Sequence, residues 1–339
     1  MMDLNTIWFI LIGFLIIGYA ILDGFDLGVG VLHLFTKEEH ERRININAIG
    51  PVWDGNEVWL ITGAGALFAA FPIVYATVFS AFYLALMLVL FALIFRAVSL
   101  EFRGKVESPK WRRAWDWAFG LGSLVPTVLF GVAIGNILRG IPIDSTGMFT
   151  GNFFTLLNPY SILVGVMSLV LFTMHGAIYM TMKSDDEQKM GMKKLASALW
   201  IGFVVLYTLI SIYSIFEAKF LFEEILSNTL FWIVFIVLLA AVFTIPVMVK
   251  AEKFGRAFLA SSVTIGCMIG LMAISLFDKL VPSSIDLAYS LTIYNASSTQ
   301  RTLFTMLIIA IIGMPFVIGY TIIIYRVFKG KVVLDEHSY

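Results

Sequence analysis

The sequence has little of what a soluble enzyme uses for chemistry. Its 339 residues include one cysteine, Cys267, and four histidines. A single cysteine excludes a disulfide within the chain and a cysteine-based metal site. Charged residues make up only 14% of the chain and the formal net charge is zero, so neither nucleic acid nor a strongly acidic partner is indicated. The widest polar segments, about 97–116 and 278–302, are too short for a separate domain of the usual ~50 residues or more.

Apolar residues are abundant instead. Hydrophobic residues reach 60% and the mean hydropathy is +0.92, whereas soluble domains are roughly 45–50% apolar. We predict an all-α polytopic membrane protein in which residues 1–339 form a single integral membrane domain, because long apolar runs cross a bilayer as helices. The nine predicted spans are 7–35, 53–71, 73–95, 117–138, 158–182, 195–216, 229–249, 257–277 and 303–325. The first run is too long for a signal-peptide core and follows no basic segment, so we expect it to be retained.

The basic residues predict the orientation of these spans. Nineteen of the 23 Lys and Arg residues lie in alternate gaps, after the first, third, fifth, seventh and ninth runs. The remaining gaps hold only Arg139, Lys219, Lys279 and Arg301. Short loops rich in Lys and Arg stay in the cytoplasm. We therefore expect the N-terminus outside and the C-terminus in the cytoplasm.

Four acids lie inside or at the edge of the first two runs. Asp23 and Asp26 are within the first run, and Asp54 and Glu57 are in the first turn of the second. A carboxylate near a bilayer centre costs about 2.5–3.5 kcal/mol on insertion scales, so such residues are informative. Members of each pair are three residues apart and share nearly the same helix face. Two antiparallel helices joined by about 17 residues could bring all four together near the cytoplasmic side.

Several interpretations of these acids remain open. Asp54 and Glu57 could simply benefit from a helix N-terminus, which stabilises acids by about 0.3–1 kcal/mol. Alternatively, closely spaced carboxylates in a low dielectric share protons, which predicts a proton path from the cytoplasm. An ion site, or packing against Arg96 at the inner end of the third run, is a further option. Asp23 and Asp26 favour a functional or interface role, because nearby glycines permit close helix approach: Gly24, Gly28 and Gly30.

The histidines indicate what the chain does not bind. A membrane haem needs axial ligands that face into a helix bundle, and only His33 and His175 are placed for this. A lone membrane histidine more often hydrogen-bonds to a neighbouring helix, so we expect no haem ligand here. His40 and His337 are interpreted as solvated. No histidine pair stands at ligand spacing, and we predict no metal site.

Aromatic and polar residues at the span ends are less specific. Five tryptophans near the inner ends are expected to be interfacial anchors: Trp53, Trp59, Trp111, Trp115 and Trp117. A quinone headgroup could stack between such rings. The outer segment 283–300 is rich in Ser and Thr, which fits either an ordinary loop or a docking surface for a partner subunit.

Two acidic motifs together resemble a known family. The segments 23–30 (DGFDLGVG) and 53–60 (WDGNEVWL) look like those of subunit II of the cytochrome bd quinol oxidases. Similar segments follow in order along the chain: 67–72 (LFAAFP), 95–98 (FRAV), 151–159 (GNFFTLLNP) and 296–300 (ASSTQ). The resemblance therefore runs from the first span to the last.

This resemblance implies a fold and a division of labour. It implies nine helices in two four-helix bundles plus one peripheral helix, and a prokaryotic cell membrane location. In the family, subunit I carries two b-type haems, a d-type haem and the quinol-oxidising loop and reduces oxygen to water, whereas subunit II binds no haem. Some members hold a structural quinone in subunit II, and a small single-helix subunit is a further partner.

The resemblance also implies roles for individual residues. Asp54 matches a proton-path acid of the family, and Asp23 and Asp26 match the other acidic motif. We add Glu57 to this path as their neighbour, with a supporting group consisting of Arg96, Trp53 and Asn56. No residue of this chain is expected to be catalytic by itself.

We therefore interpret the chain as the non-haem subunit II of an electrogenic quinol:oxygen oxidoreductase, which supports subunit I and contributes a cytoplasm-facing proton path. The alternative is a stand-alone proton-coupled transporter that uses the same four acids. Such transporters often have matching broken helices in two halves. Here the intramembrane acids are confined to the first two spans, which disfavours the transporter.

Overall fold

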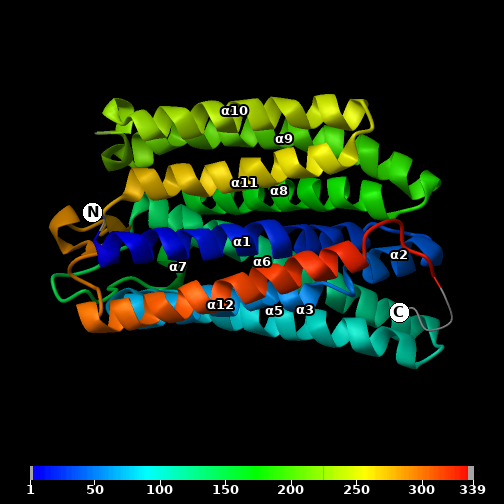
Figure 1. Ribbon diagram of the computed structural model, residues 1–339, viewed down its shortest axis with the longest axis horizontal. Helices are drawn as coiled ribbons and strands as arrows, with labels where there is room; N and C mark the ends of the chain where they lie inside the picture. The colour runs from blue at the N-terminus through cyan, green and yellow to red at the C-terminus, as the bar shows by residue number, and fades with distance from the viewer. Residues whose placement is uncertain (1–2, 224, 335–339) are drawn as a thin grey trace.

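The computed structural model describes residues 3–223 and 225–334, and long, roughly parallel or antiparallel helices dominate it (Figure 1). Within the described residues, eight helices are long and apolar enough to cross a membrane. They are α1 (Leu4–His33), α5 (Tyr83–Phe102), α6 (Pro109–Arg139), α8 (Pro159–Lys183), α9 (Asp186–Glu217), α10 (Thr229–Lys250), α11 (Phe254–Leu276) and α12 (Gln300–Val327). The predicted all-α membrane fold is confirmed.

The second and third predicted spans differ from the other seven. The second coincides with α3 (Trp53–Ala70), which packs along α1 but is less apolar because it carries Asp54 and Glu57. The third is divided into α4 (Pro72–Ala81) and α5, which meet at Phe82. Pro72 lacks an N–H group and begins α4, as proline does at a first helical position. The count of nine spans remains a prediction.

Short elements connect the long helices. They are α2 (Glu39–Ile49), η1 (Arg103–Lys105), α7 (Phe153–Leu156), η2 (Lys219–Phe222), η3 (Ile225–Ser227), β1 (Lys279–Val281), η4 (Leu287–Tyr289) and β2 (Leu291–Thr292). Strands β1 and β2 pair antiparallel, with Lys279 opposite Thr292. The predicted outer loop therefore contains a small hairpin. Its far end is bound to α1, because Asn5 Nδ2 donates to the Ile293 carbonyl at 2.6 Å.

Helix α1 is the centre of the molecule. It contacts α3, α6, α8 and α11. Farther out, α5 packs on α6, α9 packs on α8, and α10 packs on α11. Figure 1 shows α8 to α11 on one side of α1 and α3, α5 and α12 on the other. Helix α12 touches α1 and α3, and Leu303 is its only buried residue. The division into two four-helix bundles plus a peripheral helix remains a prediction.

Glycines allow α1 to approach its neighbours closely, as the sequence predicts. A Cβ atom on Gly28 would overlap the carbonyl oxygen of Phe172, and one on Gly176 would lie 2.7 Å from the Gly28 carbonyl carbon. Gly30 makes a similar close contact with Ser123 of α6. The α1 backbone therefore lies directly against the α8 backbone.

We expect Gly28→Ala to destabilise the protein by about 1–3 kcal/mol or more, because an extra methyl in a well-packed contact forces the backbones apart. Thermal unfolding of the purified protein measures the effect. Gly13→Ala is the matched control on the same helix, since no atom lies within 4 Å of a Cβ at Gly13, and it should leave stability unchanged or slightly higher. Equal stability of the two variants would contradict the close contact.

The structure corrects the interpretation of one tryptophan. Trp59 is 6% exposed, packs with Leu15 and Tyr19 of α1, and has its ring against Gly18. It lies more than a turn inside α3, so its ring points at α1 and not at the membrane interface. Trp117, in contrast, is 51% exposed. An anchoring role for the other four tryptophans remains a prediction.

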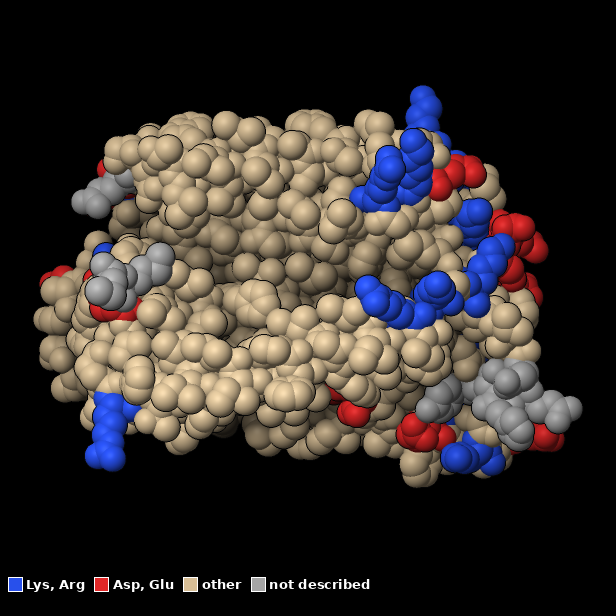
Figure 2. Space-filling model, in the orientation of Figure 1, with Lys and Arg blue, Asp and Glu red and all other residues tan. Residues whose placement is uncertain are grey.

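On the face shown in Figure 2, charged side chains lie mainly at the two ends of the molecule. Most Lys and Arg side chains gather at the end where α2 and the last turn of α12 lie, and the surface between the ends is almost free of charge. This is the distribution expected of a protein that spans a bilayer. We call the end that carries α2 the α2 end.

Candidate functional site

A buried cluster of charged side chains joins three helices. Asp23 and Asp26 of α1 and Arg96 of α5 are all fully buried, and the side chain of Glu57 of α3 is 20% exposed. Arg96 Nη2 donates to Asp23 Oδ1 at 3.1 Å, and Arg96 Nη1 donates to Glu57 Oε1. One guanidinium therefore connects α1, α3 and α5. The sequence motifs that predicted this site do meet in space, with Arg96 between them.

An amide holds the second acid. Asn56 Nδ2 donates to Asp26 Oδ2 at 2.7 Å and to the Leu22 carbonyl at 3.1 Å. The Tyr325 hydroxyl of α12 donates to Asn56 Oδ1 at 3.0 Å. The predicted supporting role of Asn56 thus has a defined geometry. Tyr325 was not predicted from the sequence, because a tyrosine near the end of the last span carries no local signal of a contact made 269 residues away.

Asp54 does not join the buried cluster. Its side chain is exposed, and its carboxylate makes no hydrogen bond within the described residues. The reason is the rotation of α3, whose buried stripe passes through Asn56, Trp59 and Gly63. Asp54 lies on the opposite, outward face. The expectation that all four acids gather is therefore wrong for Asp54, which lies about one turn before Glu57 at the α2 end. Trp53 is half-buried beside it.

Charge counting shows what the buried cluster can do. Three carboxyl groups share a single guanidinium, which contacts Asp23 and Glu57 but not Asp26. Unpaired buried charge is costly. Asp23 Oδ2 and Asp26 Oδ1 are buried without a hydrogen-bond partner among the described residues. We therefore expect at least one of the three carboxyl groups to carry a proton, since like charges at close range share protons. Such a cluster can accept and release protons.

Cation binding is a weaker fit. No group of three or more His, Cys, Asp or Glu side chains in the described residues is arranged to hold a metal ion. Arg96 already occupies the space between Asp23 and Glu57. The absence of a bound metal remains a prediction.

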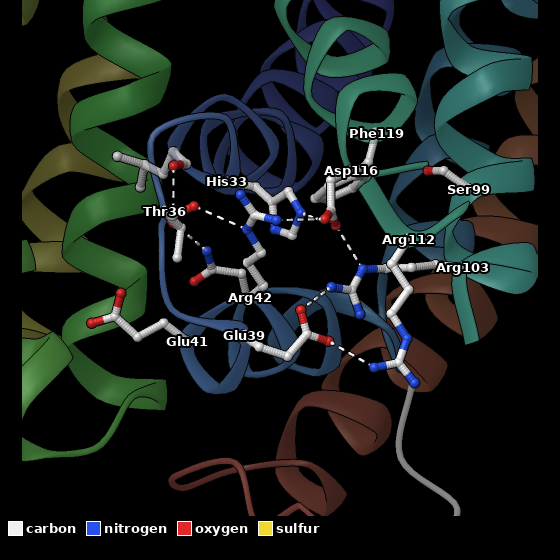
Figure 3. A network of polar contacts seen from close by, with 12 residues as sticks. His33, Thr36, Glu39, Glu41, Arg42, Ser99, Arg103, Arg112, Asp116 and Phe119 are labelled. Atoms are coloured by element: carbon white, nitrogen blue, oxygen red, sulfur yellow. Dashed lines mark hydrogen bonds and ion pairs between the residues drawn. The ribbon is translucent and has the colours of Figure 1, made fainter. Parts of the chain in front are cut away.

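A second polar network lies at the α2 end (Figure 3). Asp116 of α6 accepts hydrogen bonds from Arg42 Nη1 at 2.8 Å and Arg103 Nε at 2.6 Å, and its Oδ1 lies 2.7 Å from His33 Nε2. Arg103 also donates to Glu39 at 2.8 Å. These contacts fasten α2 onto the ends of α1, α5 and α6.

This network was not predicted from the sequence. Arg42 and Arg103 served only to predict orientation, and Asp116 stands just before the predicted span 117–138. A carboxylate between two tryptophans at the start of an apolar run is the one signal that could have identified it.

Near this network, burial raises the pKa of Glu41 on α2, and the neighbouring Asp185 adds to this effect.

The membrane histidines hydrogen-bond between helices, as predicted. His33 contacts Asp116, and His175 Nδ1 lies 2.6 Å from Ser261 Oγ while its Nε2 lies 3.1 Å from the Ile21 carbonyl. A carbonyl accepts only, so Nε2 of His175 carries a proton, and in the neutral ring Nδ1 accepts from the Ser261 hydroxyl. Both ring nitrogens of His175 are therefore in use, which does not fit haem ligation. His40 is exposed and contacts Asp185, and His337 lies outside the described residues.

Comparison with known proteins identifies the family of this chain. The family described as cytochrome bd terminal oxidase subunit II matches residues 4–328. The chain belongs to this family. It is thus a multi-pass membrane subunit of a bd-type oxidase of the respiratory chain, and the resemblance drawn from the acidic motifs is confirmed.

Individual relatives match over nearly their whole length. The chain is 40% identical to cytochrome bd ubiquinol oxidase subunit 2 of Bacillus subtilis (strain 168), over 99% of both chains. It is 36% identical to cytochrome bd-I ubiquinol oxidase subunit 2 of Escherichia coli (strain K12), over 98% of this chain and 96% of the relative. The bd oxidase structure from Geobacillus thermodenitrificans has the same fold, with a TM-score of 0.80 at 18% identity over 96% of this chain and 99% of the other. These matches do not favour a stand-alone transporter.

Proposed function

We propose that this chain is the non-haem subunit II of a quinol:oxygen oxidoreductase and conducts protons from the cytoplasm toward the site of oxygen reduction. Reduction of oxygen to water consumes one proton for each electron, so a proton supply is part of the reaction. In this proposal subunit I holds two b-type haems and a d-type haem and oxidises the quinol. The chain described here supports subunit I, and a small single-helix subunit is a further partner.

The observation that carries this proposal is the group of three carboxyl groups around Arg96. Burying these groups across α1, α3 and α5 has a large desolvation cost, which a purely structural role does not require. Proton uptake would begin at exposed Asp54, continue to half-buried Glu57, and reach Asp23 and Asp26 inside. Burial increases along this order, from an exposed side chain to fully buried ones.

The proposal requires the α2 end to face the cytoplasm. Nineteen of the 23 basic residues lie in the gaps assigned to that side, and the network around Asp116 lies there too. In a Cys267→Ser background, cysteine at exposed Ser145 or Ser284 should react with an impermeant thiol reagent added to intact cells. Cysteine at exposed Glu187 should react only after the membrane is opened. The reverse labelling pattern would overturn the orientation.

The experiment that tests the proton route is Asp54→Asn in the assembled oxidase. Asparagine keeps the shape but cannot release a proton, so we expect slower turnover and weaker generation of membrane potential in proteoliposomes, with normal haem content. The effect should be smaller than that of a buried acid, because water can reach neighbouring Glu57.

Glu107→Gln is the matched control. Glu107 is an exposed acid at the α2 end, in the connection between α5 and α6, so its neutralisation should change neither measurement. If Asp54→Asn assembles fully and behaves like this control, Asp54 is a helix-end acid and protons reach the oxygen site through another route.

A further inference from the structure

A chain of hydrogen bonds runs from the last helix to the buried acids. The Tyr325 hydroxyl of α12 donates to Asn56 of α3, and Asn56 donates to Asp26 of α1. Side chains from three helices thus form a chain of two hydrogen bonds that ends at one carboxyl group.

The bonding capacity of Asn56 explains why Tyr325 matters. A side-chain amide has two N–H donors and one carbonyl acceptor. The Nδ2 group donates to both Asp26 Oδ2 and the Leu22 carbonyl, so only Oδ1 is left, and Tyr325 is its donor. With this donor present, the amide has one orientation, in which it donates to Asp26. Asp26 Oδ1 has no partner among the described residues and is the oxygen that can carry a proton.

The segment after α12 holds Tyr325 in place. Helix α12 has few other contacts, but Lys183 Nζ donates to the Phe328 carbonyl at 2.5 Å, and the Val332 amide donates to the Lys183 carbonyl at 2.8 Å. Lys331 also pairs with Asp186 at 2.8 Å. The side chains of Val332 and Leu334 pack against the buried cluster that contains Phe25 and Tyr179. These contacts tie the end of α12 to α8 and α9.

We propose that Tyr325 is a positioning residue, which orients Asn56 so that Asp26 is presented with one oxygen hydrogen-bonded and the other available for a proton. This inference rests on the proposed proton route and names a residue that controls it. Five helices contribute a charged or titratable group near Asp26: Asp23 from α1, Glu57 from α3, Arg96 from α5, Tyr179 from α8 and Tyr325 from α12. Tyr325 acts on Asp26 through Asn56.

The test is Tyr325→Phe in the assembled oxidase. It keeps the ring, including the edge contact with Phe25 at 6.4 Å between centroids, and removes only the donor to Asn56. The amide can then turn its carbonyl toward Asp26, which favours the protonated acid. We expect turnover to fall by about three- to tenfold, the factor that corresponds to the usual free energy of one hydrogen bond. The alkaline limb of the turnover profile should also move to higher pH, by about half a unit or more.

Tyr320→Phe is the matched control, because Tyr320 is on the same helix, is 60% exposed and should give the wild-type profile. A Tyr325→Phe oxidase with normal haem content and a wild-type pH profile would overturn the proposal.

A double-mutant cycle shows whether the effect passes through Asn56. In an Asn56→Leu background no amide is left to orient, so Tyr325→Phe should add no further change to turnover or to the pH profile. In the double variant no amide oxygen is left without a donor. It can therefore be compared with Asn56→Leu even if Tyr325→Phe alone fails to assemble. An equal effect of Tyr325→Phe in both backgrounds would refute positioning through Asn56.

The variant Asp26→Asn separates this inference from the proton route itself. If Asp26→Asn turns over slowly but Tyr325→Phe has the wild-type pH profile, only the role of Tyr325 is rejected. Normal turnover of Asp26→Asn would reject the proton route and this inference with it.

Discussion

Replacing Asp26 by asparagine is expected to slow oxygen reduction by about 10²-fold, the lower end of what a positioned proton donor or acceptor contributes. Asp26 is fully buried and already hydrogen-bonded to Asn56. Asparagine has nearly the same shape and removes only the ability to carry a proton. Steady-state turnover, normalised to haem content, measures the effect.

A buried acid from the second network is the matched control. Asp116 is 4% exposed and holds Arg42 and Arg103, so Asp116→Asn should lower the amount of assembled complex but leave turnover per haem unchanged. If Asp26→Asn and Asp116→Asn both leave turnover per haem normal, the buried acids of α1 are structural.

Loss of Arg96 should affect the protein more severely than loss of any acid. Arg96→Leu leaves Asp23 and Glu57 without their cation, and breaking a buried pair in this way costs about 3–5 kcal/mol. Typical proteins have a total stability of only about 5–15 kcal/mol. We therefore expect little Arg96→Leu subunit to accumulate in membranes, as measured by immunoblot and by the haem content of the purified complex.

Arg139→Leu provides the comparison. Arg139 pairs with Glu217 at 2.8 Å, but the two side chains are 39% and 29% exposed, and exposed ion pairs contribute about 0–1 kcal/mol. This variant should accumulate normally. Equal accumulation of Arg96→Leu and Arg139→Leu would show that the buried acids do not depend on the guanidinium, and that they are neutral in the folded protein.

The sequence could predict the membrane class and most of the spans because hydrophobicity is a local property. A run of apolar residues costs free energy in water wherever it lies in the fold, and each predicted span coincides with helix in the structure. The third span was only partly predicted. Its interruption at Phe82 depends on backbone geometry that hydropathy does not register.

The acids were found for a related reason. The insertion cost of Asp23, Asp26 and Glu57 belongs to each residue, so their presence in apolar runs is visible without any knowledge of neighbours. The glycines beside them likewise predicted that α1 approaches a neighbouring helix closely, and the contact at Gly28 shows that this helix is α8.

Only the tertiary structure decided which side chains meet. The rotation of α3 about its axis turns Asn56 toward Asp26 and Asp54 outward, although all three lie in the motifs identified from sequence. Arg96, Asp116 and Tyr325 reach their partners across 73, 83 and 269 residues. Such contacts depend on the order in which helices pack and on the rotation of each helix. Side-chain packing and hydrogen bonding together select that order and rotation, and no local pattern of residues predicts them.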